Sequence, residues 1–433
     1  MKFLSNKWVM CAAGALVSFC TMGMTVTSFS VYQPYLIDIG GLTNGQSSLL
    51  ITIRSLSALV AMVLFAWFYG KVHLRLGLTI SLGFTTLAFL IFGLADSMAG
   101  YAVAAAIAGL SYGFGGMIAV SALISQWFSR HRALALGICA AATGVSSVVL
   151  SPLVTIVVQR FSLATAFLTQ TALCALITVV VGLVVRAKPQ SLPEQTEQTM
   201  VALENAPHGV DRIDIIEAEE TNQEIQAQTV NPRSPVSGRI NFRNMIPVCI
   251  AMVLMGCLGN TAYAHLSVLY STAGFSPHDV SIILSVIGFT LIVSKIVYGQ
   301  SVDRLGGYAS NNIFFALVFI GYILCSLADY ENLAGGLIAI VIAGFGLPIA
   351  TVGISVFAAD LAGVGSQIRM LQVFQVLYAI GSTIFGFVPG LIADQTGSYA
   401  PFYAATVGVT LLCFVLIQLS YRHVRRQRAH AVA

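Results

Sequence analysis

The chain has 433 residues, of which 57% are hydrophobic and only 9% are charged, and its mean hydropathy is +0.86. Soluble domains carry about 25% charged residues, so this composition excludes a soluble protein and predicts an integral membrane protein. The net charge is +4, and the basic residues are scattered over short loops without forming a basic domain, which excludes a nucleic-acid partner.

The chain begins with the basic stretch MKFLSNK and an apolar run, as a secretory signal does. The run continues to about residue 35, beyond the core of a signal peptide, so we interpret it as an uncleaved transmembrane helix. Spans of about 20 apolar residues cross a bilayer, and the sequence predicts twelve of them. The predicted spans are 8–36, 46–70, 75–96, 98–127, 132–159, 163–186, 244–272, 278–302, 309–329, 332–359, 368–393 and 398–421. Their continuous apolar character excludes a transmembrane barrel.

One hydrophilic segment, 187–243, separates the sixth span from the seventh and contains nine acidic residues. It predicts a solvated cytoplasmic tether, with a regulatory role as the alternative. The chain is thereby divided into a first lobe at 1–186, the linker, a second lobe at 244–421 and a basic tail at 422–433. If both termini are cytoplasmic, 18 Lys and Arg residues lie inside and only Arg160 lies outside, as the positive-inside rule requires of a cell-membrane protein.

Two features of the first half recur in the second. Gly144 precedes Pro152 by eight residues, and Gly381 precedes Pro389 by eight residues, at an offset of 237. The loops after the second and eighth spans, GKVHLRLG at 70–77 and GQSVDRLG at 299–306, are also alike. The duplication predicts an all-α membrane protein of two pseudo-symmetric six-helix lobes, with a site between them near mid-membrane.

These features resemble the major facilitator superfamily, whose loop signature after helices two and eight is Gly-x-x-x-Asp-Arg-x-Gly. The resemblance covers the whole chain in topology and implies a carrier that works by alternating access. The second copy matches in full, whereas the first has Leu74 in place of the acid that helps to lock the lobes in the family. The gating residues that it implies are Gly70, Arg75, Gly77, Gly299, Asp303, Arg304 and Gly306.

A narrower likeness lies in QWFSRHRALALGI at 126–138, which is similar to the helix four–five stretch of monocarboxylate transporters and oxalate:formate antiporters. Those carriers have a basic residue in helix eight, four residues before a glycine, as Lys295 stands before Gly299. The chain departs from them at Ile296, where they have proline, and at Leu291, where the animal carriers have an acid. It also has no Lys or Arg deep in helix eleven, unlike the oxalate carriers.

Lys295 lies about 12 Å inside the predicted eighth helix. A charge near the bilayer centre is costly, so it marks a functional site unless the long side chain reaches the interface. Arg54, in the second helix, is a second intramembrane cation, and its structural alternative is to cap helix-end carbonyls or to pair with Asp38. No acid lies deep in any span, so we expect the counter-ion of both cations to be the substrate, a small organic anion.

Polar residues near mid-span are further candidates for the binding site, although each alone is typical of helix–helix hydrogen bonding. These are Tyr112, Asn260, Tyr263, His265, Gln375 and Tyr378. His265 or Lys295 is a candidate for proton coupling, and anion exchange is the alternative that requires no titrating group. The sequence shows no catalytic constellation, metal-ligand spacing or phosphate loop, so we expect no enzyme activity, cofactor or metal.

The sequence therefore predicts a monomeric secondary transporter of a mono- or dicarboxylate, operating as a proton symporter or an anion exchanger. Two alternatives stay open: an efflux carrier for hydrophobic, drug-like compounds, and a membrane sensor built on a carrier fold. Deep acids that bind cationic drugs are missing, which disfavours the first. The second requires signalling through the linker.

Overall fold

The computed structural model describes residues 7–128, 132–186, 245–330, 332–361 and 367–432, and this part of the chain is helical without a strand. Twelve of its helices are long and apolar enough to cross a membrane, which confirms the predicted number of spans. The predicted linker at 187–243 lies outside the described residues, as do Ser129, Arg130 and His131 of the helix four–five motif.

The first lobe is built from six spans, of which the first, second and fourth are divided into shorter helices. Its elements are α1 (Lys7–Ser18), η2 (Phe19–Thr27), η3 (Phe29–Val31), α2 (Tyr32–Asp38), α3 (Asn44–Val63), α4 (Phe65–Lys71), α5 (Leu74–Leu94), α6 (Met98–Gly115), α7 (Met117–Trp127), α8 (Arg132–Arg160) and α9 (Leu163–Val184). The element η2 is a π-helix, a rare form with hydrogen bonds between residues five apart that is frequent at functional sites.

The second lobe repeats this plan. Its elements are α12 (Ile246–Gly256), η5 (Cys257–Thr261), α13 (Ala262–Ala264), α14 (Leu266–Thr272), α15 (Pro277–Leu305), α16 (Gly307–Cys325), η6 (Ala328–Tyr330), α17 (Leu333–Gly346), η7 (Leu347–Ala350), α18 (Val352–Leu361), α19 (Gln367–Phe385), α20 (Val388–Thr396) and α21 (Ala400–Val432). The opening span is again interrupted by a π-helix, η5, at the position equivalent to η2. The segment predicted as a basic tail continues α21.

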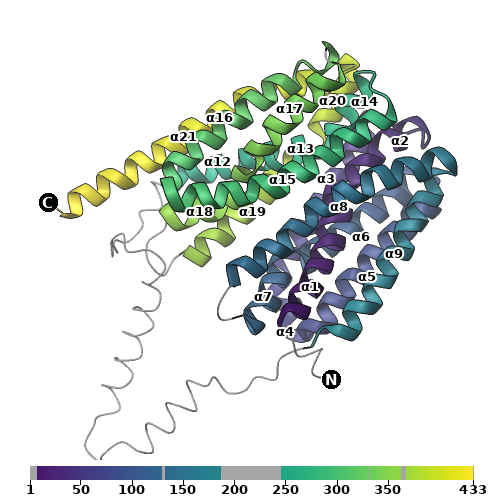
Figure 1. The fold of residues 1–433 in the computed structure, drawn as a ribbon, viewed down its shortest axis with the longest axis horizontal. Helices are drawn as coiled ribbons and strands as arrows, with labels where there is room; N and C mark the ends of the chain where they lie inside the picture. Colours follow the sequence, from purple (N-terminus) through teal and green to yellow (C-terminus); the bar gives the residue numbers. More distant parts are fainter. Residues whose placement is uncertain (1–6, 129–131, 187–244, 331, 362–366, 433) are drawn as a thin grey trace, which may run out of the picture.

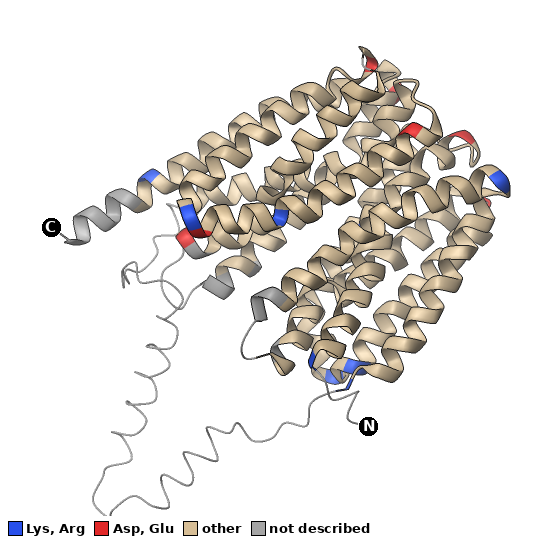
Figure 2. Cartoon of the chain, viewed as in Figure 1, with Lys and Arg blue, Asp and Glu red and all other residues tan. Residues whose placement is uncertain are grey.

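The two lobes lie side by side and converge at one end of the bundle (Figure 1). We call this the far end, and the opposite end, where α1 begins and α21 ends, the near end. In Figure 2 the acidic segments lie mostly at the far end and the basic segments mostly at the near end. The positive-inside rule concerns the basic residues alone, and it expects them to gather at one end.

The lobes are joined along a seam made by two helix pairs, α3 with α19 and α20, and α8 with α15. The first pair meets at successive turns, listed from mid-membrane to the far end: Ser55 with Ser382, Thr52 with Gly386, Ser48 with Gly390 and Gly45 with Asp394. In the second pair, a Cβ added to Gly144 would lie 2.5 Å from Ile292 Cγ1, and Ser147 Oγ donates to the carbonyl of Leu284 at 3.1 Å. These seam contacts run from mid-membrane to the far end, so the structure is closed at the far end.

Candidate functional site

Lys295 lies on α15, one helical turn toward the near end from Ile292, where that helix touches α8. Its side chain is partly exposed and makes no hydrogen bond or ion pair with any residue that the structure describes. Figure 2 shows a basic segment partway along α15, away from both of its ends. A cation placed where the lobes part, with no counter-ion in the described part of the chain, is available to a ligand.

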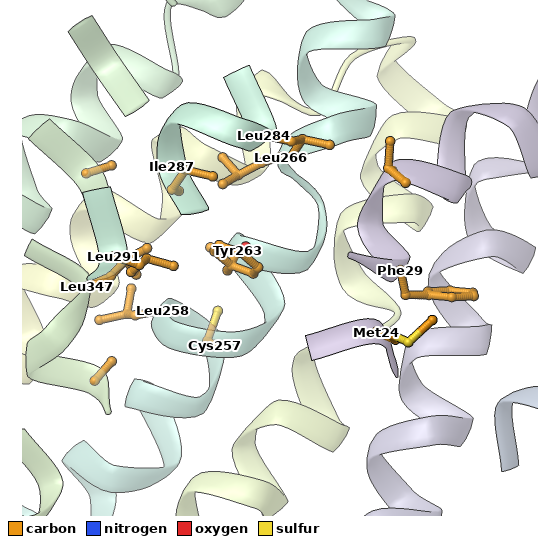
Figure 3. Packing of buried hydrophobic residues seen from close by; sticks show 14 of the residues in the cluster. Met24, Phe29, Cys257, Leu258, Tyr263, Leu266, Leu284, Ile287, Leu291 and Leu347 are labelled. Carbon is orange, nitrogen blue, oxygen red and sulfur yellow. The ribbon is translucent and has the colours of Figure 1, made fainter. Parts of the chain in front are cut away.

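The acids of the described residues do not reach Lys295. Asp360, close to the end of α18, accepts a hydrogen bond from the Tyr421 hydroxyl at 2.7 Å. Leu291, one turn from Lys295, is 8% exposed and points toward Leu258 and Leu347 in the interior of the second lobe (Figure 3). The position at which the resemblance to the animal carriers would place an acid is therefore part of an apolar core in this chain.

Arg54 lies on α3 and is only 3% exposed. Its Nη1 donates to the carbonyl of Thr25 at 2.8 Å, and Thr25 belongs to the π-helix η2. Its Nη2 is buried and has no hydrogen-bond partner among the residues that the structure describes. The bond from Nη1 to a helix carbonyl is the structural alternative predicted from sequence. It uses one terminal nitrogen of Arg54 and leaves the other available.

A pocket with about 350 Å³ of empty space lies between the lobes, just beyond the Ser55–Ser382 contact of the seam. Four of the predicted binding residues line it together, one from α6 in the first lobe and three from the second lobe: Tyr112, Asn260, Gln375 and Tyr378. The rest of the lining is Ser55, Ala58, Met62, Ala379 and Ser382. The pocket therefore draws on both lobes and is polar but uncharged.

The polar groups of the pocket are largely free to bind a ligand. Asn260 Nδ2 donates to Ser382 Oγ, which orients the amide and leaves Asn260 Oδ1 as an acceptor. The hydroxyl groups of Tyr112 and Tyr378 make no hydrogen bond with a described residue. Neither Lys295 nor Arg54 lines the pocket, although Arg54 directly precedes Ser55 in α3.

His265 does not line the pocket either. It is fully buried in the seam, where its ring nitrogens contact both lobes: Nδ1 lies 2.8 Å from the carbonyl of Thr261 and Nε2 lies 2.9 Å from Ser48 Oγ. Because a carbonyl only accepts, Nδ1 carries the proton, and in the neutral ring Nε2 accepts from the Ser48 hydroxyl. The structure thus places His265 where the lobes close and away from the lining of the pocket.

The predicted gating residues lie at the near end. Asp303 and Arg304 are exposed at the end of α15, which Gly306 terminates with a φ of +82°, a conformation that favours glycine. In the first lobe, Arg75 donates from Nε and Nη2 to the carbonyl of Gly182 at 2.8 and 2.5 Å. Of the glycines, Gly77 is tightly packed against Tyr69.

Gly70 and Gly299, by contrast, have open space around them. No described contact joins the two signature loops across the lobes, as expected of a state that is closed at the other end.

Sequence reasoning missed the pocket residues Ser55, Met62 and Ser382. Ser382 directly follows Gly381 of the repeated Gly–Pro motif, and Ser55 directly follows Arg54. Their proximity to those residues was the available signal, but serine in a membrane helix is too common for the signal to be specific.

Comparison with known proteins matches one family model and relatives named as monocarboxylate transporters. The family model described as "Major Facilitator Superfamily" matches residues 14–367 and 248–432. The chain is 23% identical over 287 residues to monocarboxylate transporter 12 of Mus musculus, covering 64% of this chain and 57% of that protein. It is 25% identical over 303 residues to monocarboxylate transporter 13 of Bos taurus, covering 69% and 63%. The chain thus spans less than two thirds of the length of these relatives.

Solved structures share the fold at low sequence identity. A mutant of the nucleoside transporter NupG superposes with a TM-score of 0.70 at 12% identity, covering 96% of this chain and 100% of that one. A D-xylose-proton symporter superposes with a TM-score of 0.62 at 12% identity, covering 98% and 96%. These likenesses establish the fold alone.

Proposed function

Because the chain belongs to the major facilitator superfamily, we propose that it carries a small organic anion, a mono- or dicarboxylate, across a membrane by alternating access. The observation that carries this proposal is Lys295, a cation that has no counter-ion among the described residues and lies where the lobes part. The names of the relatives, monocarboxylate transporters, support the same class of substrate.

The substrate carboxylate is proposed to bind the ammonium group of Lys295, which acts as a point charge. The uncharged pocket is proposed to receive the rest of the substrate. Arg54 Nη2, buried without a partner, is the proposed second contact for an anion that reaches it. Among the described residues, no carboxylate lies at this depth to take up a proton. Net transport is therefore proposed to couple to a proton on the substrate or on the seam histidine, and anion exchange is the alternative mode.

The experiment that tests the proposal is thermal melting of the purified protein with short mono- and dicarboxylates, inorganic anions and matched neutral analogues. A ligand that binds only the folded protein raises the melting temperature, Tm, by mass action. At a concentration of 100 times Kd the stabilisation is about 2.7 kcal/mol. We expect a rise with carboxylates and none with the corresponding amides or alcohols.

A second candidate, transport of a neutral polar solute, is favoured by the uncharged lining of the pocket. Sugars and nucleosides therefore belong in the same panel. A rise in Tm with these compounds, and none with any carboxylate, would replace the anion proposal. A rise only with bulky apolar compounds would favour an efflux carrier.

The protein is proposed to lie in a cell membrane with its near end on the cytoplasmic side, because the described basic residues mostly gather there. Phe161, which is 73% exposed at the far end, is suited to a labelling test, since seven of the eight native cysteines are buried and Cys249 is half-buried. Phe161→Cys is expected to react with a membrane-impermeant maleimide on intact cells. Leu305→Cys, at the near end, should react only after the cells are opened, and the reverse result would invert the topology.

A further inference from the structure

One seam contact differs in kind from the others because it involves a charge. Asp394, on α20 of the second lobe, accepts two backbone hydrogen bonds from the first turn of α3 in the first lobe. Its Oδ1 lies 3.0 Å from the Asn44 nitrogen and its Oδ2 lies 2.8 Å from the Gly45 nitrogen. A single carboxylate therefore spans the two lobes at the far end.

The first N–H groups of a helix have no partner within the helix and lie at its positive end, where a carboxylate binds well. In α3, Thr43 and Gln46 form a capping box, in which Thr43 Oγ1 accepts from the Gln46 N–H. This cap from the first lobe leaves the N–H groups of Asn44 and Gly45 unsatisfied. Asp394 takes both, so the cap of α3 is divided between the two lobes.

The surrounding contacts show how closely the lobes meet here. A Cβ added to Gly45 would lie 2.7 Å from Asp394 Oδ2, and one added to Gly390 would collide with the carbonyl of Asn44 and with Ser48 Oγ. The Tyr399 hydroxyl donates to Asn44 Oδ1 at 3.2 Å. The carboxylate thus reaches the amides only because glycines stand on both sides of the seam.

We propose that Asp394 is a gating residue: its bidentate bond to the start of α3 latches the far end shut, and each transport cycle must break it. The inference requires only that the chain alternates between two faces. It does not depend on the substrate being an anion, and it can fail or succeed independently of that proposal.

The test measures distances between spin labels at both ends of the full-length protein. One pair, Phe161→Cys with Tyr330→Cys, joins the lobes at the far end at sites 73% and 90% exposed. The other, Leu76→Cys with Leu305→Cys, joins them at the near end at sites 53% and 58% exposed. Asp394→Ala is expected to raise the population with a long far-end distance roughly threefold to tenfold. The population with a short near-end distance should rise by the same factor. A general loosening of the structure would instead broaden both distance distributions.

Gly45→Ala approaches the latch from the other lobe, because its methyl group displaces the carboxylate while alanine suits a helix better than glycine. It should shift both distances as Asp394→Ala does, and it decides the matter if that variant does not fold. Asp329→Ala is the matched control, since Asp329 accepts from Ser398 Oγ at 3.0 and 2.8 Å within the second lobe. Unchanged populations in both test variants, an equal shift in the control, or a native protein open at the far end in every molecule would overturn the proposal.

Discussion

Replacing Lys295 with methionine is expected to abolish most of the rise in Tm that a short carboxylate gives to the purified protein. A hydrogen bond to a charged group contributes about 1.5–3 kcal/mol, so the affinity should fall roughly tenfold to a hundredfold. Lys295→Arg should retain part of the response, because the charge remains. The ligand-free protein should not be destabilised, since an unpaired cation near mid-membrane costs about 2.5–3.5 kcal/mol on insertion scales.

The matched control for this experiment is Arg304→Met, which removes an exposed cation from the end of the same helix. Its carboxylate response should equal that of the native protein, because Arg304 lies at the near end outside the site. An undiminished response in Lys295→Met would remove the assignment of Lys295 as the anion contact. It would leave the membership of the superfamily and the latch at Asp394 untouched.

The twelve spans and their repeat were predictable because continuous apolar runs and recurring glycine–proline motifs are local properties of the sequence. The meeting of Tyr112, Asn260, Gln375 and Tyr378 in one pocket was predictable only through the expectation of a site between two lobes. The depth of each residue in its span could be estimated from the sequence. Which helix faces meet is decided by how the two lobes pack against each other.

Other features depend on details that a helix period does not reveal. His265 is a predicted binding residue, but its ring lies in the seam between Ser48 and the carbonyl of Thr261, a contact that a helix period does not reveal. The Arg54 partner, the carbonyl of Thr25, belongs to the π-helix η2, and the stretch FCTMGMTVT carries no signal for such a helix. Asp394 reads as an ordinary exposed acid at a helix end, since its partner amide lies 350 residues earlier in the chain.

Arg54→Met is expected to separate a functional arginine from a structural one. The substitution removes the bond to the carbonyl of Thr25, worth about 1.5–3 kcal/mol, and also removes a buried cation with an unpaired nitrogen. Because an intramembrane charge costs about 2.5–3.5 kcal/mol, the two effects nearly cancel, and the free energy of unfolding without ligand should change by less than about 1 kcal/mol.

The response to anions should change far more. If Nη2 is the second contact, the affinity for a dicarboxylate should fall roughly tenfold or more, and the affinity for a monocarboxylate should fall less. Arg75→Met is the control, since Arg75 also binds a helix carbonyl in the same lobe but is exposed, at the near end. Melting curves of both variants, with and without dicarboxylate, provide the comparison. A large loss of stability in Arg54→Met with an unchanged dicarboxylate response would make Arg54 a structural cap of η2, and Lys295 alone would then hold the proposed anion.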